Sequence, residues 1–80
     1  MKYKDQFVWL RGYRVHGVFG IKLEELNGYI REYNESYSCG VIDFWDWLRY
    51  EKDIDAEGFS VLWNDKNPEM NKLIEIKSAA

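Results

Sequence analysis

The sequence has few of the residues that build disulfide frameworks, metal centres and sharp chain breaks. Its 80 residues include one cysteine, Cys39, one proline and one histidine, His16. A single cysteine excludes an intramolecular disulfide framework and a multi-cysteine metal site, so a reducing, cytoplasmic setting is expected. No apolar run is long enough for a signal peptide or a membrane span, which predicts a soluble protein that does not enter the membrane.

Residues that could form a catalytic centre are also scarce. His16 would have to act as the lone general base, and no pattern marks a partner for it. Cys39 has no nearby lysine or arginine to stabilise a thiolate. The spacing of Gly12, Gly17 and Gly20 fits neither of the common phosphate-binding loops. We therefore expect no enzymatic activity and no cofactor.

What the chain does contain is a high content of large apolar side chains. Hydrophobic residues make up 46% of the sequence, and 14 residues are Phe, Trp or Tyr. A few large aromatic side chains can supply the buried area that so short a chain otherwise lacks. Residues 1–80 are thus expected to form one small globular domain.

The charge is unevenly distributed along the chain. The first 22 residues carry a balance of +4, whereas residues 23–80 carry six bases against thirteen acids, a balance of −7. A field of this size can steer a basic partner, although it is too weak to imitate a nucleic acid.

The N-terminal part of the chain favours β-structure. Residues 6–18 are rich in β-branched and aromatic side chains and are broken by Gly12 and Gly17, which predicts one or two short strands. A helical turn over residues 5–11, closed by Gly12, is the alternative.

A first helix is predicted over residues 21–33. Its apolar residues recur at helical spacing, at Leu23, Leu26, Tyr29, Ile30 and Tyr33. Gly28 interrupts this pattern at a cost of about 1 kcal/mol relative to alanine, so we expect it to allow a neighbouring element to approach closely.

A second helix, over residues 41–51, has two contrasting faces. At about 100° per residue, one face carries Val41, Phe44, Trp45 and Leu48, and the other carries Asp43, Asp46, Trp47 and Tyr50. The first face is predicted to feed the core. The second joins aromatics to carboxylates on a surface that folding does not need, which indicates a partner-binding face. In the alternative, Trp47 and Tyr50 pack beneath a loop with their polar tips in water.

The C-terminal part predicts a further strand and one ambiguous segment. Phe59, Val61 and Trp63 alternate with more polar residues, which is typical of a strand. Residues 72–77 favour the second strand of a hairpin, and a helix beginning near Pro68 is the alternative. The whole pattern predicts an α+β fold with two central helices packed on a small, mainly antiparallel sheet; a winged-helix fold is the alternative.

Three carboxylates, at Asp53, Asp55 and Glu57, alternate before Gly58 as in the first half of an EF-hand loop. The bidentate glutamate that should close such a loop is replaced by Asn64. We therefore interpret this stretch as an acidic turn and expect no metal site.

These patterns support two functional hypotheses. The first is a non-enzymatic module, such as a bacterial or phage-encoded inhibitor or adaptor, that binds a basic protein surface through Asp43, Asp46, Trp47 and Tyr50. Inhibitor and immunity proteins such as the barstar family use a similar acidic and aromatic helix, although no motif here matches theirs residue by residue. The second is a nucleic-acid-binding domain. The basic and aromatic side chains that would contact the nucleic acid are those of Lys4, Trp9, Arg11, Tyr13 and Arg14.

Overall fold

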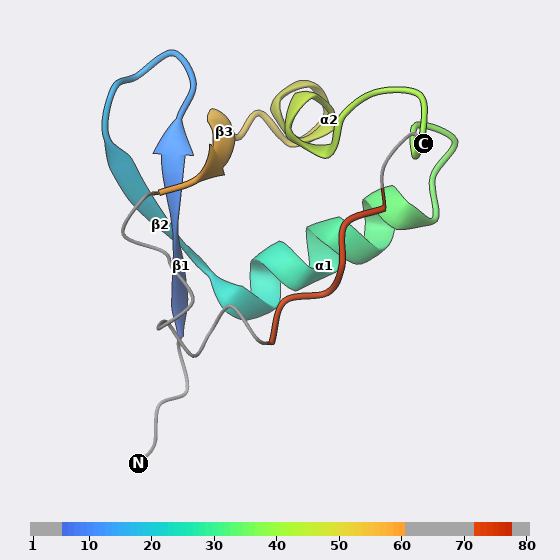
Figure 1. The fold of residues 1–80 in the computed structure, drawn as a ribbon, viewed down its shortest axis with the longest axis horizontal. Coiled ribbons are helices and arrows are strands. Elements are labelled where there is room, and N and C mark those ends of the chain that lie inside the picture. Colours follow the sequence, from blue (N-terminus) through green and yellow to red (C-terminus); the bar gives the residue numbers. More distant parts are fainter. Residues whose placement is uncertain (1–5, 61–71, 78–80) are drawn as a thin grey trace.

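The computed structural model describes residues 6–60 and 72–77. Two strands are followed by two helices and a third strand (Figure 1). The elements are β1 (Phe7–Gly12), β2 (Val18–Lys22), α1 (Leu23–Asn34), α2 (Phe44–Lys52) and β3 (Ala56–Phe59). The fold is therefore a small α+β fold with an antiparallel sheet, and this part of the prediction is confirmed.

The sheet is open and three-stranded, with the order β2-β1-β3. β1 pairs with both neighbours in antiparallel orientation. Its residues alternate, so that Val8 and Leu10 are buried whereas Phe7, Trp9 and Arg11 are exposed on the opposite face. Both helices lie on one side of the sheet (Figure 1), and they pack against the face that carries Val8 and Leu10.

β2 begins later in the chain than predicted. Ile21, predicted as the first residue of the first helix, instead pairs with Val8 in the sheet and is buried there. Gly20 lies opposite Trp9, and a Cβ atom at Gly20 would come within 3.0 Å of the Trp9 ring. The missing side chain therefore leaves room for the indole to lie over the sheet.

α1 confirms the predicted apolar stripe, with Leu23, Leu26, Ile30 and Tyr33 buried. The predicted close approach at Gly28 is not made by any described residue. Within residues 6–60 and 72–77, no heavy atom lies within 4 Å of a Cβ built at this position, outside the helix's own backbone and the flanking residues.

α2 begins at Phe44 because the preceding Asp43 caps it. The Asp43 carboxylate accepts a hydrogen bond from the backbone N–H of Trp45 at 2.9 Å. Val41 therefore lies in the turn before the helix, where it is 74% exposed, and its predicted place in the core is wrong. Asp53 ends the helix in the left-handed conformation, with φ 56°.

The core lies between the sheet and the helices. It contains Val8, Leu10, Ile21, Leu23, Leu26, Ile30, Tyr33, Phe44, Trp47, Leu48 and Ala56. Tyr33 and Phe44 meet edge to face within it, with ring centroids 5.4 Å apart. Three of these eleven core residues, Tyr33, Phe44 and Trp47, are aromatic.

Residues 72–77 run beside α1 (Figure 1). Residues 73–77 form neither a strand nor a helix, whereas Lys72 lies in a 3-10 turn; the predicted start of the alternative helix, near Pro68, lies outside the described residues. β3 begins at Ala56, before the predicted strand, and the positions of Val61 and Trp63 lie outside the described residues. The winged-helix alternative stays a prediction, because most of its hairpin also lies outside them. None of the helices in the described part of the chain is long and apolar enough to cross a membrane.

Candidate functional site

Trp47 lies in the core, so the prediction that it forms part of an exposed face is wrong. Its side chain is only 3% exposed, and its ring centroid is 5.5 Å from that of Tyr33 and 5.9 Å from that of Phe44. α2 contacts both α1 and β3, so its buried face is wider than a single row of residues at helical spacing. Trp45, predicted as a core residue, is half-buried at the edge of this arc, against Phe59.

The other residues of the predicted partner-binding face remain at the outer edge of α2. Tyr50 is 80% exposed, Asp43 is exposed, and Asp46 is half-buried. Their spacing of three and four residues places them on one side of the helix. Glu51 is also exposed next to Tyr50. Tyr50, Asp43 and Glu51 are therefore exposed on α2, whereas Trp47 is not part of this surface.

The two cations of α2 are engaged by neighbouring groups. Arg49 forms an ion pair with Asp46 and donates a hydrogen bond to the carbonyl oxygen of Ala56 at 2.7 Å. Lys52 forms an ion pair with Glu32 of α1 at 3.1 Å. Arg49 thus balances the charge of Asp46, whereas the exposed carboxylates of Asp43 and Glu51 form no ion pair with another described residue.

The residues of the predicted nucleic-acid-binding set occupy different surfaces. Lys4 lies outside the described residues. Trp9 stacks on Phe7 on the open face of the sheet, with ring centroids 6.5 Å apart and an interplanar angle of 28°. Arg11 lies on the same face, where its Nε is 3.1 Å from a Glu57 carboxylate oxygen. The guanidinium charge is therefore balanced within the protein.

Tyr13 and Arg14 lie in the loop between β1 and β2, close to α2. The Arg49 guanidinium lies over the Tyr13 ring, 3.8 Å from its centroid. A shallow cavity of about 260 Å³ is lined by Tyr13, Arg14, Arg49, Tyr50 and Asp53. The fold thus brings Tyr50, from the predicted partner-binding face, close to Tyr13 and Arg14, from the predicted nucleic-acid-binding set.

The carboxylate of Asp55 holds this loop in place. It accepts hydrogen bonds from the backbone N–H groups of Tyr13 at 3.1 Å, Arg14 at 2.9 Å and Val15 at 3.1 Å. Arg14 Nε lies 2.8 Å from its second oxygen. The hydrogen bond from the Arg14 side chain, with those from the backbone, lowers the pKa of Asp55 to about 2. The same contact raises the pKa of Arg14. We call this arrangement the Asp55 clamp.

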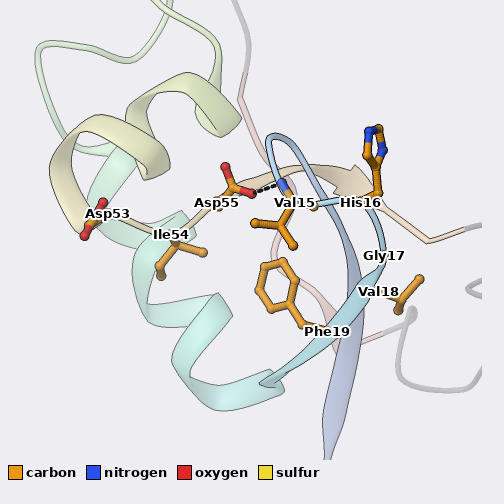
Figure 2. Close-up of a pocket in the computed structure, with 9 residues that line it drawn as sticks. Val15, His16, Gly17, Val18, Phe19, Asp53, Ile54 and Asp55 are labelled. Carbon is orange, nitrogen blue, oxygen red and sulfur yellow. Dashed lines mark hydrogen bonds between the residues drawn. The ribbon is translucent and has the colours of Figure 1, made fainter.

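A cavity of about 490 Å³ lies beside the clamp, between the loop and the segment that joins α2 to β3. Val15, Phe19 and Ile54 point toward one another across it, whereas His16 points away (Figure 2). The cavity is therefore mainly apolar and does not receive the imidazole of His16.

The alternating carboxylates before Gly58 point in different directions. Asp55 faces the loop, Glu57 pairs with Arg11, and Asp53 is exposed at the end of α2. Among residues 6–60 and 72–77, no three His, Cys, Asp or Glu side chains are placed to hold a metal ion.

Sequence reasoning missed the Asp55 clamp and the exposed position of Phe7. The only signal for Asp55 was its place in an acidic run, which does not indicate a partner 40 residues away.

Comparisons of the chain with protein-family models, curated proteins and solved structures find no match.

Proposed function

We propose that this chain is a non-enzymatic interaction module that binds a basic protein surface through the outer edge of α2. Tyr50 is the aromatic anchor, and Asp43, Asp46 and Glu51 supply the surrounding negative charge. The observation that carries the proposal is the exposure of Tyr50 on a helix whose core contacts are already made by Phe44, Trp47 and Leu48.

The composition of this edge supports an interaction site. Tyrosine is enriched among the residues that dominate binding energy at protein interfaces, because its ring adds contact area and its hydroxyl a hydrogen bond. The exposed carboxylates of Asp43 and Glu51 favour a basic partner, since complementary charge speeds encounter and rejects acidic surfaces. Arg49 balances the charge of Asp46, so the negative charge that favours a basic partner comes from Asp43 and Glu51.

The test compares two exposed tyrosines. The immobilised wild-type chain and its Tyr50→Ala and Tyr37→Ala variants are used to capture proteins from native cell lysate, and bound proteins are identified by mass spectrometry. Tyr37 is fully exposed in the turn after α1 and serves as the matched control. Loss of an aromatic anchor costs about 2 kcal/mol or more, so Tyr50→Ala should weaken binding about 30-fold while Tyr37→Ala leaves it unchanged.

The charge of the partner is tested separately with Asp43→Asn and Glu51→Gln. Asparagine preserves the helix cap at position 43, so this double variant removes charge without removing the cap. Binding of the partner should fall with added salt in the wild type and fall less steeply in the variant. A captured protein that Tyr50→Ala and Tyr37→Ala retain equally, or whose binding is independent of salt, would contradict the proposal.

A second candidate function is single-stranded nucleic-acid binding on the open face of the sheet. The specific observation in its favour is the exposed Phe7–Trp9 stack, since exposed aromatics on a sheet are typical stacking platforms for bases. Glu57 and Asp55 balance the charges of Arg11 and Arg14, which leaves less positive charge for a phosphate backbone.

Fluorescence anisotropy with single-stranded DNA and RNA probes distinguishes the two functions. The interaction module should bind these probes weakly at physiological salt. Submicromolar affinity that is lost in both Trp9→Ala and Arg11→Ala would favour nucleic-acid binding over protein binding.

A further inference from the structure

β2 is an outer strand of the sheet, and part of its backbone faces away from β1. The N–H of Gly12 donates to the carbonyl oxygen of Gly17 at 2.9 Å, which fixes which residues of the antiparallel pair bond to each other. Val18 and Gly20 lie at the alternate positions, so their backbone groups point outward. No described residue bonds these outward N–H and C=O groups. The edge of β2 therefore has room for the backbone of a further strand.

Two cavities follow this edge. The cavity of about 490 Å³ beside the Asp55 clamp extends along β2 from Gly17 to Phe19. A second cavity, of about 350 Å³, continues from Phe19 to Lys22. Phe19 and Ile54 line both cavities, so the two lie next to each other. We call this pair of cavities the β2 groove.

The centre of the β2 groove is apolar. Val15, Phe19 and Ile54 point toward one another there (Figure 2). Phe19 and Ile54 are half-buried against the core, whereas Val15 is 71% exposed. An aliphatic side chain placed between them would remove apolar surface from water, which is favourable. The groove is therefore suited to aliphatic side chains at its centre.

A carboxylate lies at each end of the β2 groove. Glu25 lines the cavity beside Lys22, and Asp53 lies at the other end, where its side chain points outward (Figure 2). Both carboxylates are exposed, and neither forms an ion pair with a described residue. The Lys22 side chain belongs to the open face of the sheet, because Lys22 lies opposite the exposed Phe7. The two ends of the groove thus favour positive charge.

We propose that the edge of β2 binds an extended segment of a partner protein, which adds a fourth strand to the sheet. The segment has aliphatic side chains over the centre of the β2 groove and a basic side chain at each end. Its backbone bonds to Val18 and Gly20 supply affinity, and its alternate side chains supply specificity. The extended chain from Gly17 to Lys22 measures about 17 Å, so basic residues about six positions apart reach both carboxylates.

The charge of the β2 groove favours a partner protein over a second copy of this chain. Two copies that paired through β2 in antiparallel orientation would place the Glu25 end of each groove against the Asp53 end of the other. Like charges would then meet at both ends, which opposes association. A partner segment with lysine or arginine at these positions meets opposite charge instead.

The test measures binding of a fluorescein-labelled peptide, KTVTVTK, to the full chain by fluorescence anisotropy. Its two lysines and two valines stand at alternate positions, so an extended strand presents them on one face. The peptide ETVTVTE is the matched control with reversed charge. The wild type should bind KTVTVTK about ten-fold more tightly than ETVTVTE. Equal binding of the two peptides, or binding of neither, would overturn the proposal.

The double variant Glu25→Gln, Asp53→Asn tests the carboxylates. Glutamine still accepts the hydrogen bond that Tyr29 donates to Glu25, and asparagine tolerates the left-handed conformation of residue 53. Affinity for KTVTVTK should fall about ten-fold. The control variant Glu24→Gln, Glu35→Gln removes equal charge from exposed positions outside the groove and should change affinity by less than about two-fold. Equal losses would mean that net charge alone attracts the peptide, contrary to the proposal.

Two exposed valines test the apolar centre. Val15 lies in the β2 groove, and Val41 is similarly exposed in the turn before α2. Val15→Ser should weaken binding of KTVTVTK about five-fold, because the valine loses its apolar contact with the peptide. Val41→Ser should leave the affinity unchanged. Equal affinities of the two variants would place the peptide elsewhere on the protein and refute the proposed site.

Sedimentation velocity identifies the occupant of the edge. The wild type should sediment as a monomer, because like charges oppose pairing of two β2 strands. A dimer that is dissociated by KTVTVTK would show that a second copy occupies the edge, and would exclude the proposed partner segment.

Hydrogen exchange of the wild-type chain gives a check that needs no variant. The amides of Val18 and Gly20 face outward, so they should exchange quickly in the free protein and slowly when KTVTVTK is bound. Those of Phe19 and Ile21 face β1 and should be protected in both states. Unchanged exchange at Val18 and Gly20 in the presence of saturating peptide would show that no strand is added, and the proposal would then be wrong.

Discussion

At the scale of single residues, Trp47 and Tyr50 show that the packing of neighbouring elements decides whether an aromatic side chain is buried or exposed. Both belong to α2 and are three residues apart, yet Trp47 is buried against Tyr33 whereas Tyr50 is exposed. A helical wheel placed them on one face because it contains no information about a second packing partner. α1 supplies that partner for Trp47 alone.

This difference predicts opposite effects on stability. Trp47→Ala should lower the free energy of unfolding by about 3–5 kcal/mol, as other large-to-small core substitutions do. Tyr50→Ala should change it by less than about 0.5 kcal/mol, because the side chain is exposed. Urea denaturation followed by circular dichroism measures both. Equal effects of the two substitutions would contradict the assignment of Trp47 to the core.

At the scale of the elements, α1 contains a glycine, Gly28, against which none of the described residues packs. A Cβ there would meet no heavy atom of the described chain within 4 Å, outside the flanking residues and the helix's own backbone. Glycine in the interior of a helix destabilises the helix, because folding removes more backbone conformational freedom at glycine than at alanine.

Gly28→Ala should therefore stabilise the protein by about 0.5–1 kcal/mol, measured as a higher urea midpoint at unchanged slope. Gly20→Ala is the matched control, because its Cβ would clash with the ring of Trp9. A loss of stability in Gly28→Ala would mean that a neighbouring element does pack against this position.

The cap of α2 can be tested in the same way. Asp43→Ala removes the acceptor for the Trp45 N–H and should cost about 1 kcal/mol, whereas Asp43→Asn keeps an acceptor and should cost little. Thermal unfolding of the two variants distinguishes them. Equal losses would indicate that the charge of Asp43, and not its hydrogen bond, stabilises the helix.

At the scale of the whole molecule, the Asp55 clamp joins parts of the chain that are distant in sequence. It links the loop between β1 and β2 to the segment between α2 and β3 through three backbone N–H groups and Arg14. These bonds require an ionised carboxylate, so the clamp makes stability depend on pH.

The direction follows from the lowered pKa of Asp55, which is about 2 in the folded protein against 3.8 for an ordinary aspartate. The folded state holds the proton more weakly than the unfolded chain does. The contribution of the clamp is therefore complete above about pH 4 and is lost as the pH falls toward 2. Urea denaturation between pH 7 and pH 2.5 measures this decline.

Asp55→Asn serves as the control, because it cannot titrate. Its stability should be lower than that of the wild type at pH 7 and should fall less steeply below pH 4. Parallel declines in the two proteins would show that other carboxylates cause the acid sensitivity.

The amino-acid sequence by itself determined the class of fold and most of the first helix. Apolar residues at helical spacing predicted the buried stripe of α1. A high content of β-branched and aromatic residues predicted short strands near β1, and alternation predicted a strand near β3. These features are local, because the periods of helices and strands are set by the backbone and are visible within about ten residues. The same reasoning predicted an outward face of Asp43, Asp46, Trp47 and Tyr50, of which Asp43 and Tyr50 are exposed and Trp47 is buried.

Only the tertiary structure decided which residues meet across long separations. It buried Trp47 by bringing α1 against α2, closed the clamp between Asp55 and Arg14, and laid residues 72–77 along Asn27 and Asn34. Each of these contacts joins partners that no repeat or spacing connects. Their positions are set by the packing of the helices on the sheet, because the side chains that meet belong to elements whose distance is fixed only when the core forms.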